Sequence, residues 1–372
     1  MRILALEPYH GGSHKAFLDG WIAHSRHDWT VLGLPPFKWK WRMRHAPITF
    51  ADDVAGRTDA GEEWDALLCS DMLNLPEFLG LAPDAVSKLP CIAYFHENQL
   101  TYPYRFEDER DYQYCFSNMA TALAATQVWF NSAFHRDEFL EAIPVFLKKM
   151  PDHQPWDIVE RIRARSHVRA PGIAKPVERG PRPSGPLRIL WAARWEHDKD
   201  PDAFFEALGL LKERGVDFRV SVIGETFRGM PPCFEQAKAT FAGHIDRWGY
   251  QKSRADYDAA LAEADVVVST AQHEFFGISV VEAVAAGCRP ALPRRLAYPE
   301  IFGELEKEAS VFYEGGAAGL ADTLAELAER SERGELWQGD PGGGVRTVSR
   351  FFWENHAADL DGAMDTLRAC DG

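Results

Sequence analysis

The chain opens with Met1–Ile22, MRILALEPYHGGSHKAFLDGWI, and this stretch decides the fold class. An apolar run at Ile3–Leu6 is followed by Gly11 and Gly12 and then by apolar residues at helical spacing, with Ser13 as a candidate N-cap. A strand, a glycine turn and a helix in this order open a doubly wound α/β sheet.

The same alternation continues through the N-terminal half. Four further short apolar runs, separated by segments with helical spacing, are predicted to be strands: 29–34, 66–70, 91–96 and 128–131. Strands that alternate with helices predict a parallel sheet covered on both faces.

A composition break separates this half from the next. Residues 170–186, APGIAKPVERGPRPSGP, hold five prolines and three glycines and leave little for a regular element to use. After the break the alternation restarts, with expected strands at 188–192, 219–223 and 266–270 and expected helices at 201–213 and 277–286. The predicted organisation is a domain at 1–172, a linker at 173–186, a second domain at 187–344 and a C-terminal helix at 345–372 that packs back on the first domain.

Length and charge restrict the partners. The 372 residues suffice for two to three domains, and 41 Lys and Arg against 56 Asp and Glu give a net charge of −15. An acidic chain is repelled on average by nucleic acid and by anionic lipid, so such a partner needs a local basic patch. Residues 38–44 are the candidate patch.

Cysteine usage and hydropathy predict the compartment. The six cysteines are scattered without a C-x-x-C pair, which favours free thiols in a reducing environment over a disulfide framework or a zinc site. The first apolar run is far shorter than a signal-peptide core, and no stretch approaches the ~20 apolar residues of a membrane span. We therefore expect a cytoplasmic protein with no membrane contact, while the oligomeric state is left open.

The most specific motif is EFFGISVVE at 274–282, directly after the expected strand 266–270. Glu274 lies in the strand-to-helix loop and Glu282 about a turn and a half into the helix, so both carboxylates are expected to face a common crevice. The backbone amides of 275–277 at the helix start suit a phosphate or a developing negative charge. The alternative is that both are surface glutamates stabilised by the helix dipole.

A second cluster, WAARWEHDKDP at 191–201, favours the functional interpretation. Arg194 and Lys199 occupy the loop between a strand and a helix, where a guanidinium and an ammonium can hold a diphosphate and neutralise it as it leaves. We expect the two clusters to come from adjacent strand ends.

These motifs resemble the retaining GT-B glycosyltransferases through the R-x4-K pair, Gly224, the strand ADVVVST and E-x7-E. More narrowly, the chain resembles the tRNA-queuosine mannosyltransferase family over nearly its whole length. The segments that carry this second resemblance are GGSHK (11–15), KWKWR (38–42), YFHENQLTYP (94–103), PDH (151–153), RWEHDKDP (194–201), IGETF (223–227), WGY (248–250) and HEFFG (273–277). The resemblance implies two Rossmann-like doubly wound domains facing a cleft, with the donor bound by 187–344, and transfer of mannose from GDP-mannose to queuosine in a tRNA anticodon.

The resemblance also implies residue roles. Arg194 and Lys199 would bind the donor diphosphate, Glu282 its ribose and Glu274 the sugar hydroxyls, while His96 would lie beside the transferred sugar. His96, Glu274, Arg194 and Lys199 are thus the expected catalytic residues. The other donor-binding residues that it implies are Gly11, Gly12, Tyr250, Phe275, Phe276 and Gly277.

Each role has a structural alternative. A lone histidine such as His96 is more often a satisfied polar residue than a catalyst. Gly11 and Gly12 suit any tight turn. Trp248 and Tyr250 could be core aromatics, and for Trp248 the core interpretation is favoured.

The basic segment at 38–44, KWKWRMR, interleaves cations with indoles. Such a strip can contact phosphates and stack on the unpaired bases of an RNA loop. The expected acceptor-binding residues are Lys38, Trp39, Lys40, Trp41, Arg42 and Arg44. The alternative is a solvated strand or loop with tryptophans packed underneath. Four arginines within 161–169 could continue the surface or lie on an exposed helix face.

No metal or other cofactor is expected. The D-x-D pattern occurs three times in this acidic chain, at 198–200, 256–258 and 359–361, so it specifies little. Lys199 can satisfy Asp198 and Asp200, and two cations are available to neutralise the diphosphate.

The reaction expected from the resemblance retains the anomeric configuration by a same-face route, in which the leaving phosphate helps to deprotonate the acceptor. Glu274 and His96 would position the sugar. Two alternatives stay open: a GT-B transferase with another nucleotide sugar and a lipid, glycan or small-molecule acceptor, or a non-catalytic module that binds a nucleotide sugar or RNA.

Overall fold

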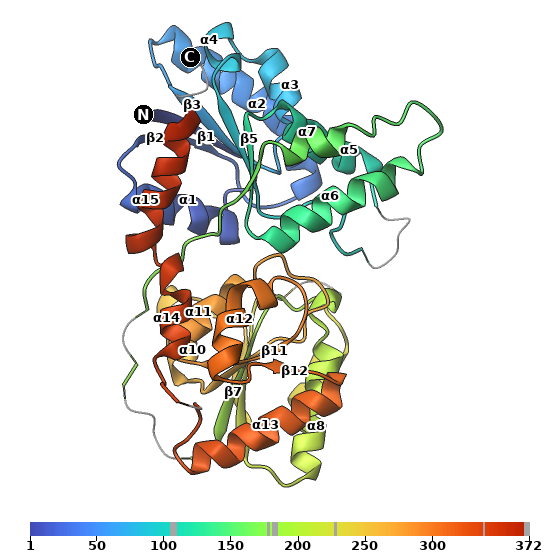
Figure 1. Ribbon diagram of the computed structural model, residues 1–372, viewed down its shortest axis with the longest axis vertical. Helices are drawn as coiled ribbons and strands as arrows, with labels where there is room; N and C mark the ends of the chain where they lie inside the picture. Colours follow the sequence, from blue (N-terminus) through green and yellow to red (C-terminus); the bar gives the residue numbers. More distant parts are fainter. Residues whose placement is uncertain (105–109, 177–178, 181–184, 227–228, 338, 368–372) are drawn as a thin grey trace. The chain divides into compact units, whose positions relative to one another are not determined.

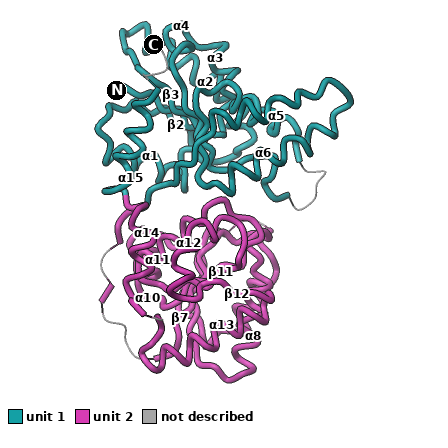
Figure 2. The backbone as a smooth tube through the Cα atoms, viewed as in Figure 1, with its two compact units in different colours: residues 1–173, 353–372 teal, residues 174–352 magenta. Residues whose placement is uncertain are grey.

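A computed structural model describes residues 1–104, 110–176, 179–180, 185–226, 229–337 and 339–367. The chain divides into two compact units, one made of residues 1–173 and 353–372 and the other of residues 174–352 (Figure 2). Each unit holds one parallel six-stranded sheet among the described residues, with helices packed against it (Figure 1). The predicted fold class, two Rossmann-like doubly wound α/β domains, is confirmed.

In the first unit, strands and helices alternate along the chain. Its elements are β1 (Arg2–Glu7), α1 (Gly12–His24), β2 (Asp28–Gly33), α2 (Trp39–Asp59), β3 (Ala66–Ser70), α3 (Leu75–Leu81), α4 (Asp84–Ser87), β4 (Cys91–Phe95), α5 (Tyr112–Ala124), β5 (Gln127–Phe130), α6 (Ala133–Leu147), α7 (Ile158–Arg163), β6 (Ser166–Val168) and α15 (Trp353–Asp365). The strand order is β2-β1-β3-β4-β5-β6, so the direction of winding reverses between β1 and β3. Open α/β sheets bind ligands at the carboxyl ends of the strands beside such a reversal.

Both faces of this sheet are buried, because successive side chains of a strand point to opposite faces. Ile3 and Ala5 of β1 pack in one core with Trp21 of α1 and with α15. Leu4 and Leu6 pack in the other core with α2, α3, α5 and α6.

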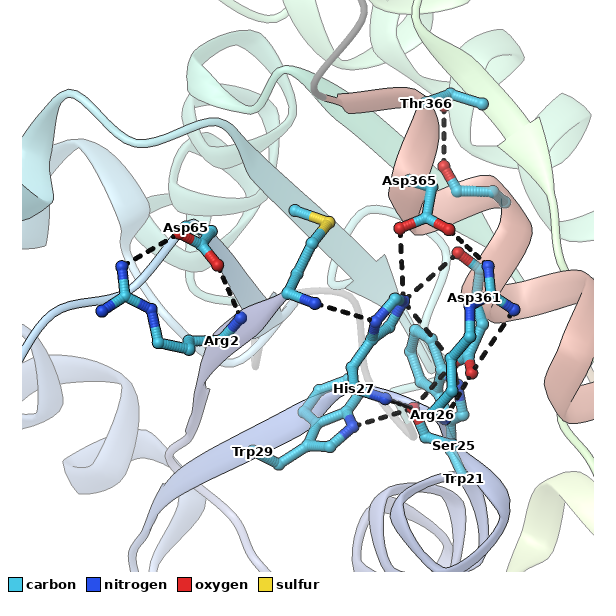
Figure 3. Close-up of polar contacts among 12 residues, drawn as sticks. Arg2, Trp21, Ser25, Arg26, His27, Trp29, Asp65, Asp361, Asp365 and Thr366 are labelled. Atoms are coloured by element: carbon cyan, nitrogen blue, oxygen red, sulfur yellow. Dashed lines mark hydrogen bonds and ion pairs between the residues drawn. The ribbon is translucent and has the colours of Figure 1, made fainter.

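The buried carboxylate of Asp361 links the C-terminal helix α15 to residues near the N-terminus by hydrogen bonds (Figure 3). Asp361 is 1% exposed and accepts hydrogen bonds from Trp21 Nε1 at 2.8 Å, Ser25 Oγ at 2.7 Å and the Arg26 amide at 2.8 Å. Arg26 also pairs with Asp365. The last helix is therefore an integral part of the first unit.

In the second unit, the elements are β7 (Leu187–Ala192), η2 (His197–Lys199), α8 (Pro201–Glu213), β8 (Phe218–Ile223), α9 (Cys233–Thr240), β9 (Ile245–Gly249), α10 (Arg254–Glu263), β10 (Val266–Val268), α11 (Ile278–Ala285), β11 (Arg289–Pro293), α12 (Tyr298–Glu308), β12 (Phe312–Tyr313), α13 (Gly316–Glu332), α14 (Gly343–Val348) and η3 (Ser349–Phe351). The strand order β12-β11-β10-β7-β8-β9 is that of dinucleotide-binding sheets, and the reversal falls between β7 and β10.

Several predicted boundaries differ from the structure. The expected N-cap Ser13 is wrong, because α1 begins at Gly12 and its N-cap is Gly11. Instead of one helix from 345 onward, α14 and η3 belong to the second unit, and the chain joins the first unit from Trp353. Of the predicted linker, positions 177–178 and 181–184 lie outside the described residues.

The strands β6, β9 and β12 are not predicted from the sequence. Each lies at an edge of its sheet, where one side of the strand has no neighbour; β6 and β12 are short, and β9, IDRWG, mixes polar with apolar residues. A short or partly polar edge strand has no long apolar run, so hydrophobic patterning gives it little signal.

The five described cysteines are free thiols, and Cys370 lies outside the described residues. None of the helices described is long and apolar enough to cross a membrane.

Candidate functional site

Lys199 is the centre of a charged cluster beyond the carboxyl end of β7. Its buried Nζ donates to the His273 carbonyl at 2.7 Å and to Glu274 Oε2 at 3.2 Å, and lies 3.0 Å from Asp198 Oδ2. Two of the three hydrogens of the ammonium are thus donated to oxygens, and Asp198 adds an ion pair. Burial lowers the pKa of Lys199, but the carboxylates of Glu274 and Asp198 outweigh burial and raise it. Lys199 is therefore a cation at neutral pH.

Glu274 and Arg194 complete this cluster. Burial raises the pKa of Glu274, but the charges of Lys199 and Arg194 outweigh it and lower the pKa below its usual value. Arg194 is 42% exposed and lies 3.3 Å from Glu196. At this sheet edge Lys199 thus lies between the carboxylates of Glu274 and Asp198, and Arg194, which pairs with Glu196, is accessible to solvent.

The loops after β7 and β10 are bonded to each other. These two strands are neighbours in the sheet, as the sequence analysis predicts. Thr270 Oγ1 donates to the Lys199 carbonyl at 2.8 Å, and the Gln272 amide donates to the Asp198 carbonyl at 2.8 Å. The backbone around Lys199 is therefore held by the loop that carries Glu274.

The start of α11 presents backbone rather than side chains. The side chains of Phe275 and Phe276 are buried. These two residues can therefore contact a ligand only through their backbone amides. Gly277 has φ +84°, and a Cβ there would lie 2.8 Å from the Tyr298 ring, so both conformation and space require glycine. Ser279 Oγ donates to the Ala192 carbonyl at 2.7 Å, which ties α11 to the end of β7.

Glu282 has partners of its own, on α10. Its carboxylate accepts from Arg254 Nη1 at 2.9 Å and from the Tyr257 hydroxyl at 2.8 Å. Burial, reinforced by Glu282, raises the pKa of Tyr257, which keeps that hydroxyl a donor. A carboxylate has about four acceptor positions, so Glu282 retains capacity for a ribose diol.

The aromatic residues around the end of β9 separate into two environments. Trp248 packs edge-on against Trp195 with ring centroids 5.3 Å apart, which agrees with its favoured core interpretation. Tyr250 is 64% exposed and is accessible to a ligand. Phe227 of the IGETF segment lies outside the described residues.

In the first unit, His96 follows β4 at the carboxyl edge of the sheet. The residue is half-buried, and its ring contacts the rings of His14, Phe17 and Tyr94. Burial, together with the charges of His14 and His135, lowers the pKa of His96 well below its usual value. His96 is therefore a neutral imidazole.

Sequence reasoning missed three ionisable residues around His96. Glu7 ends β1, His14 lies on α1 and Asp71 follows β3, so all three lie at the reversal between β1 and β3. The available signals were a carboxylate that ends a buried apolar run and a histidine directly after the glycine turn.

The first-loop glycines differ in their surroundings. A Cβ on Gly11 would lie 2.3 Å from Pro36, so close packing requires glycine there. Gly12 has φ +53° and open space where a Cβ would be. Open space leaves room for a ligand to approach the backbone.

The basic aromatic segment forms the start of α2 and not a strand or loop. Lys38, Lys40, Trp41 and Arg44 are exposed, with Trp41 at 61%. Trp39 packs against Tyr114 with ring centroids 5.1 Å apart.

Arg42 differs from the rest of the segment. It is 8% exposed, donates through Nε to the Pro35 carbonyl at 3.0 Å and lies over the Phe37 ring at 4.4 Å. These contacts give Arg42 a structural role within the first unit. In the 161–169 stretch, Arg165 also serves structure, donating to the carbonyls of Leu123 and Ala125.

Within the described residues, one group of side chains has ligand atoms close enough to hold a metal ion. Glu7, His14 and His96 place these atoms within 4.8 Å of one another. Of the first D-x-D pair, Asp198 pairs with Lys199, and Asp200 caps α8 through the Ala203 amide at 3.3 Å.

Comparisons with known proteins agree with this architecture. Residues 2–173 match the family model described as tRNA-queuosine alpha-mannosyltransferase N-terminal, and residues 175–337 match glycosyl transferases group 1. The chain is 37% identical over 313 residues to the tRNA-queuosine alpha-mannosyltransferase of Drosophila melanogaster, a match that covers 81% of each protein. It is 26% identical over 187 residues to a GDP-mannose-dependent alpha-(1-6)-phosphatidylinositol dimannoside mannosyltransferase of Mycobacterium tuberculosis, covering 50% of this chain and 46% of that protein.

Similar solved structures support the fold. A sucrose-phosphate synthase from Thermosynechococcus elongatus has a TM-score of 0.74 at 13% identity over the full length of both chains. The Anabaena protein HepE, solved with UDP, has a TM-score of 0.68 at 15% identity, covering 98% of this chain and 100% of the other. Because the two family models together match residues 2–173 and 175–337, and the identity to the Drosophila enzyme extends over most of both proteins, the chain belongs to the tRNA-queuosine alpha-mannosyltransferase family of glycosyltransferases.

Proposed function

We propose that this chain transfers mannose from GDP-mannose to queuosine in the anticodon of tRNA, with retention of configuration. The observation that carries the proposal is the cluster of Lys199, Arg194 and Glu274 beside the reversal between β7 and β10. The names of the Drosophila and mycobacterial relatives support the acceptor and the donor, respectively.

The charged cluster fits the chemistry of a leaving diphosphate. As the glycosidic bond loosens, negative charge grows on the phosphate and positive charge on the sugar. Fixed cations aimed at the phosphate stabilise that transition state without reorganising. Lys199 is held by hydrogen bonds and stays charged, and Arg194 can offer a bidentate fork.

A diphosphate at Lys199 would compete with the present partners of the ammonium, which donates to the His273 carbonyl and to Glu274 and forms an ion pair with Asp198. We expect a diphosphate oxygen to replace Glu274 on the ammonium. Glu274 would then be free to accept hydrogen bonds from the sugar hydroxyls while remaining ionised. The leaving phosphate would deprotonate the acceptor on the same face, and neutral His96 would hydrogen-bond the sugar.

We propose further that catalysis needs no metal ion. The two cations supply the charge compensation that a metal would otherwise give. Asp198 and Asp200, which resemble a metal-binding pair in sequence, serve Lys199 and the N-terminus of α8 instead.

For the acceptor, the exposed cations Lys38, Lys40 and Arg44 with Trp41 suit an RNA loop. Trp41 offers an open indole face for a base, and the cations offer phosphate contacts. A tRNA acceptor and the free thiols support a cytoplasmic enzyme.

Mass spectrometry of nucleosides tests the function. The protein is incubated with GDP-mannose or UDP-glucose and with tRNA that carries queuosine, and tRNA with an unmodified guanosine at that position is the matched control. We expect queuosine to gain one hexose with GDP-mannose only. Donor hydrolysis without tRNA modification would overturn the acceptor and support another GT-B substrate, and neither hydrolysis nor transfer would support a binding module.

A further inference from the structure

The first two turns of α5 carry two exposed aromatic side chains. Tyr112 is 39% exposed and Phe116 is 42% exposed, and a spacing of four positions puts them on one face of the helix. Both rings pack edge-on against the Phe146 ring of α6, with centroids 5.1 Å apart in each pair. Val145, the neighbour of Phe146 in the chain, is 61% exposed. Exposed apolar side chains that gather in one place are typical of an interaction surface.

Lysines border these aromatic rings. Lys148 and Lys149 follow Val145 within about one turn, at the end of α6, and both are exposed. The Lys149 Nζ atom lies 5.6 Å from the centroid of the Tyr112 ring. The end of α6 therefore places ammonium groups beside an exposed ring of α5.

The same turn of α5 contacts the basic start of α2. The Tyr114 hydroxyl donates to the Lys40 carbonyl at 3.0 Å, and the Tyr114 ring packs against Trp39. Arg44 lies over the Tyr114 ring at 4.9 Å and lies 3.8 Å from Asp111, the N-cap of α5. The exposed rings of α5 and the basic segment of α2 are therefore parts of one continuous surface.

This continuous surface is positively charged. Three carboxylates lie on it or near it in the chain, those of Asp111, Glu141 and Asp152, and Asp111 is paired with Arg44. They are outnumbered by five exposed cations: Lys38, Lys40, Arg44, Lys148 and Lys149. The local charge thus has the opposite sign to the net charge of −15 of the whole chain, as binding of a polyanion requires.

The starts of α2 and α5 lie at the sheet edge that carries His96. The chain enters α2 from β2 and α5 from β4, and the connection that leaves a parallel strand starts at its carboxyl end. Arg110, two positions before α5, donates to the carbonyls of Gln99 and Leu100 at 2.7 and 2.8 Å. These bonds tie the start of α5 to the loop that follows His96.

We propose that an α5–α6 surface, made of Tyr112, Phe116, Val145, Lys148 and Lys149, is a second binding surface for the tRNA acceptor beside the start of α2. Its aromatic rings stack on unpaired bases of the anticodon loop, and its lysines bind the adjacent phosphates. Stacking accepts any base, because every base has an aromatic face. The proposal rests on the proposed function, because it gives the same acceptor a further set of contacts.

A nucleic acid fits this surface better than a second copy of the chain does. A stable dimer usually buries about 1,200–2,000 Å². Tyr112, Phe116 and Val145 are too few apolar side chains for such an area. Two copies that each carry a net charge of −15 also repel one another. A base, in contrast, needs only one ring, and a neighbouring ammonium matches its phosphate.

A leucine variant removes the aromatic faces but keeps apolar contacts. Tyr112→Leu/Phe116→Leu can still pack against Phe146, so the protein should stay folded. In fluorescence anisotropy, a labelled anticodon stem–loop RNA should bind about tenfold more weakly for each lost stacking contact. A blunt RNA duplex of the same length has no unpaired bases, and its binding should not change. Leu81→Ser, at an exposed leucine that ends α3, is the matched control and should alter neither affinity.

A lysine variant tests the phosphate contacts separately. Lys148→Ala/Lys149→Ala keeps the rings, and the salt slope of stem–loop binding should fall by ~0.7 for each lost contact. In transfer assays, this variant and the leucine variant should raise the KM for tRNA. Both should leave kcat and the donor KM nearly constant, because these side chains bind the acceptor away from the reacting sugar.

Several results would overturn the proposal. One is unchanged stem–loop binding by the folded leucine variant. Another is equal weakening of stem–loop and duplex binding, which would exclude stacking. A wild-type dimer in sedimentation velocity that the leucine variant dissociates, with RNA binding unchanged, would assign this surface to a second copy of the chain. If wild-type protein binds the stem–loop but transfers no mannose, the proposed function fails, and the anisotropy data still decide whether this surface binds RNA.

Discussion

The Nζ atom of Lys199 lies 3.2 Å from Oε2 of Glu274, although 75 positions separate the two residues. They belong to loops that follow the neighbouring strands β7 and β10. The contact therefore depends on the parallel pairing of these strands, which brings both carboxyl ends to one sheet edge.

Removing the charge of Lys199 should disable transfer. Lys199→Met keeps the length of the side chain but loses the ammonium, and we expect turnover to fall about 10²-fold or more because a preorganised charge at the leaving phosphate is gone. Arg194→Ala should have a similar effect. Steady-state kinetics with Lys212→Met, an exposed lysine of α8, serve as the control. Near-normal turnover of a folded Lys199→Met/Arg194→Ala protein would contradict the assignment.

Replacing Glu282 should affect the binding of the donor more than the rate of the chemical step. Glu282→Gln keeps the volume but weakens the hydrogen bonds to a ribose diol, so the donor KM should rise roughly tenfold with a smaller change in kcat. Tyr257→Phe removes one partner of this carboxylate without touching its charge, and should raise KM less. A fall in kcat at constant KM would argue against ribose binding.

The start of α2 should bind RNA through its exposed cations. Lys38→Ala/Lys40→Ala/Arg44→Ala should weaken tRNA binding and reduce the salt slope by ~0.7 for each lost contact to a single-stranded phosphate. Lys88→Ala removes an exposed cation elsewhere in the first unit and should leave the slope unchanged. Donor affinity, measured by calorimetry, should be constant throughout, and an unaltered slope in the triple variant would exclude this segment.

Asp361 should be needed for stability of the first unit. Asp361→Ala leaves the donors of Trp21, Ser25 and Arg26 without their buried acceptor, at an expected cost of about 2–4 kcal/mol in the free energy of unfolding. Asp359→Ala, on the same helix but exposed, should cost less than ~0.5 kcal/mol. Urea unfolding of the two variants measures the difference, and equal midpoints would show that α15 is held by its apolar face alone.

Chelation should leave transfer intact. Since Lys199 and Arg194 compensate the diphosphate, turnover after dialysis against EDTA should equal that of untreated protein. Recovery of a lost activity by an added divalent cation would contradict the metal-free proposal.

Hydrophobic patterning was sufficient to predict the positions of the central strands of each sheet, but it predicted most of the edge strands poorly. Buried strands such as β3 and β4 are uninterrupted apolar runs, because helices cover both faces, and their positions follow from the sequence. The edge strands β6, β9 and β12 carry short or mixed patterns, and pairing with one neighbour defines them. Asp361 shows the same limit, since nothing local marks an acidic residue of a C-terminal helix as the acceptor for three N-terminal donors.

By itself the sequence determined the two doubly wound sheets and the motif residues Arg194, Lys199, Glu274, Glu282 and His96, because periodic burial and characteristic spacing are local properties. Only the tertiary structure decided which partners these residues contact. Glu274 contacts Lys199, and Glu282 contacts Arg254 and Tyr257. The tertiary structure also decided that Arg42 is buried while Trp41 is exposed. It also brought Glu7 and His14 together behind His96. The physical reason is that hydrogen bonds and ion pairs act over a few ångströms in space, and strand order places residues far apart in the chain at those distances.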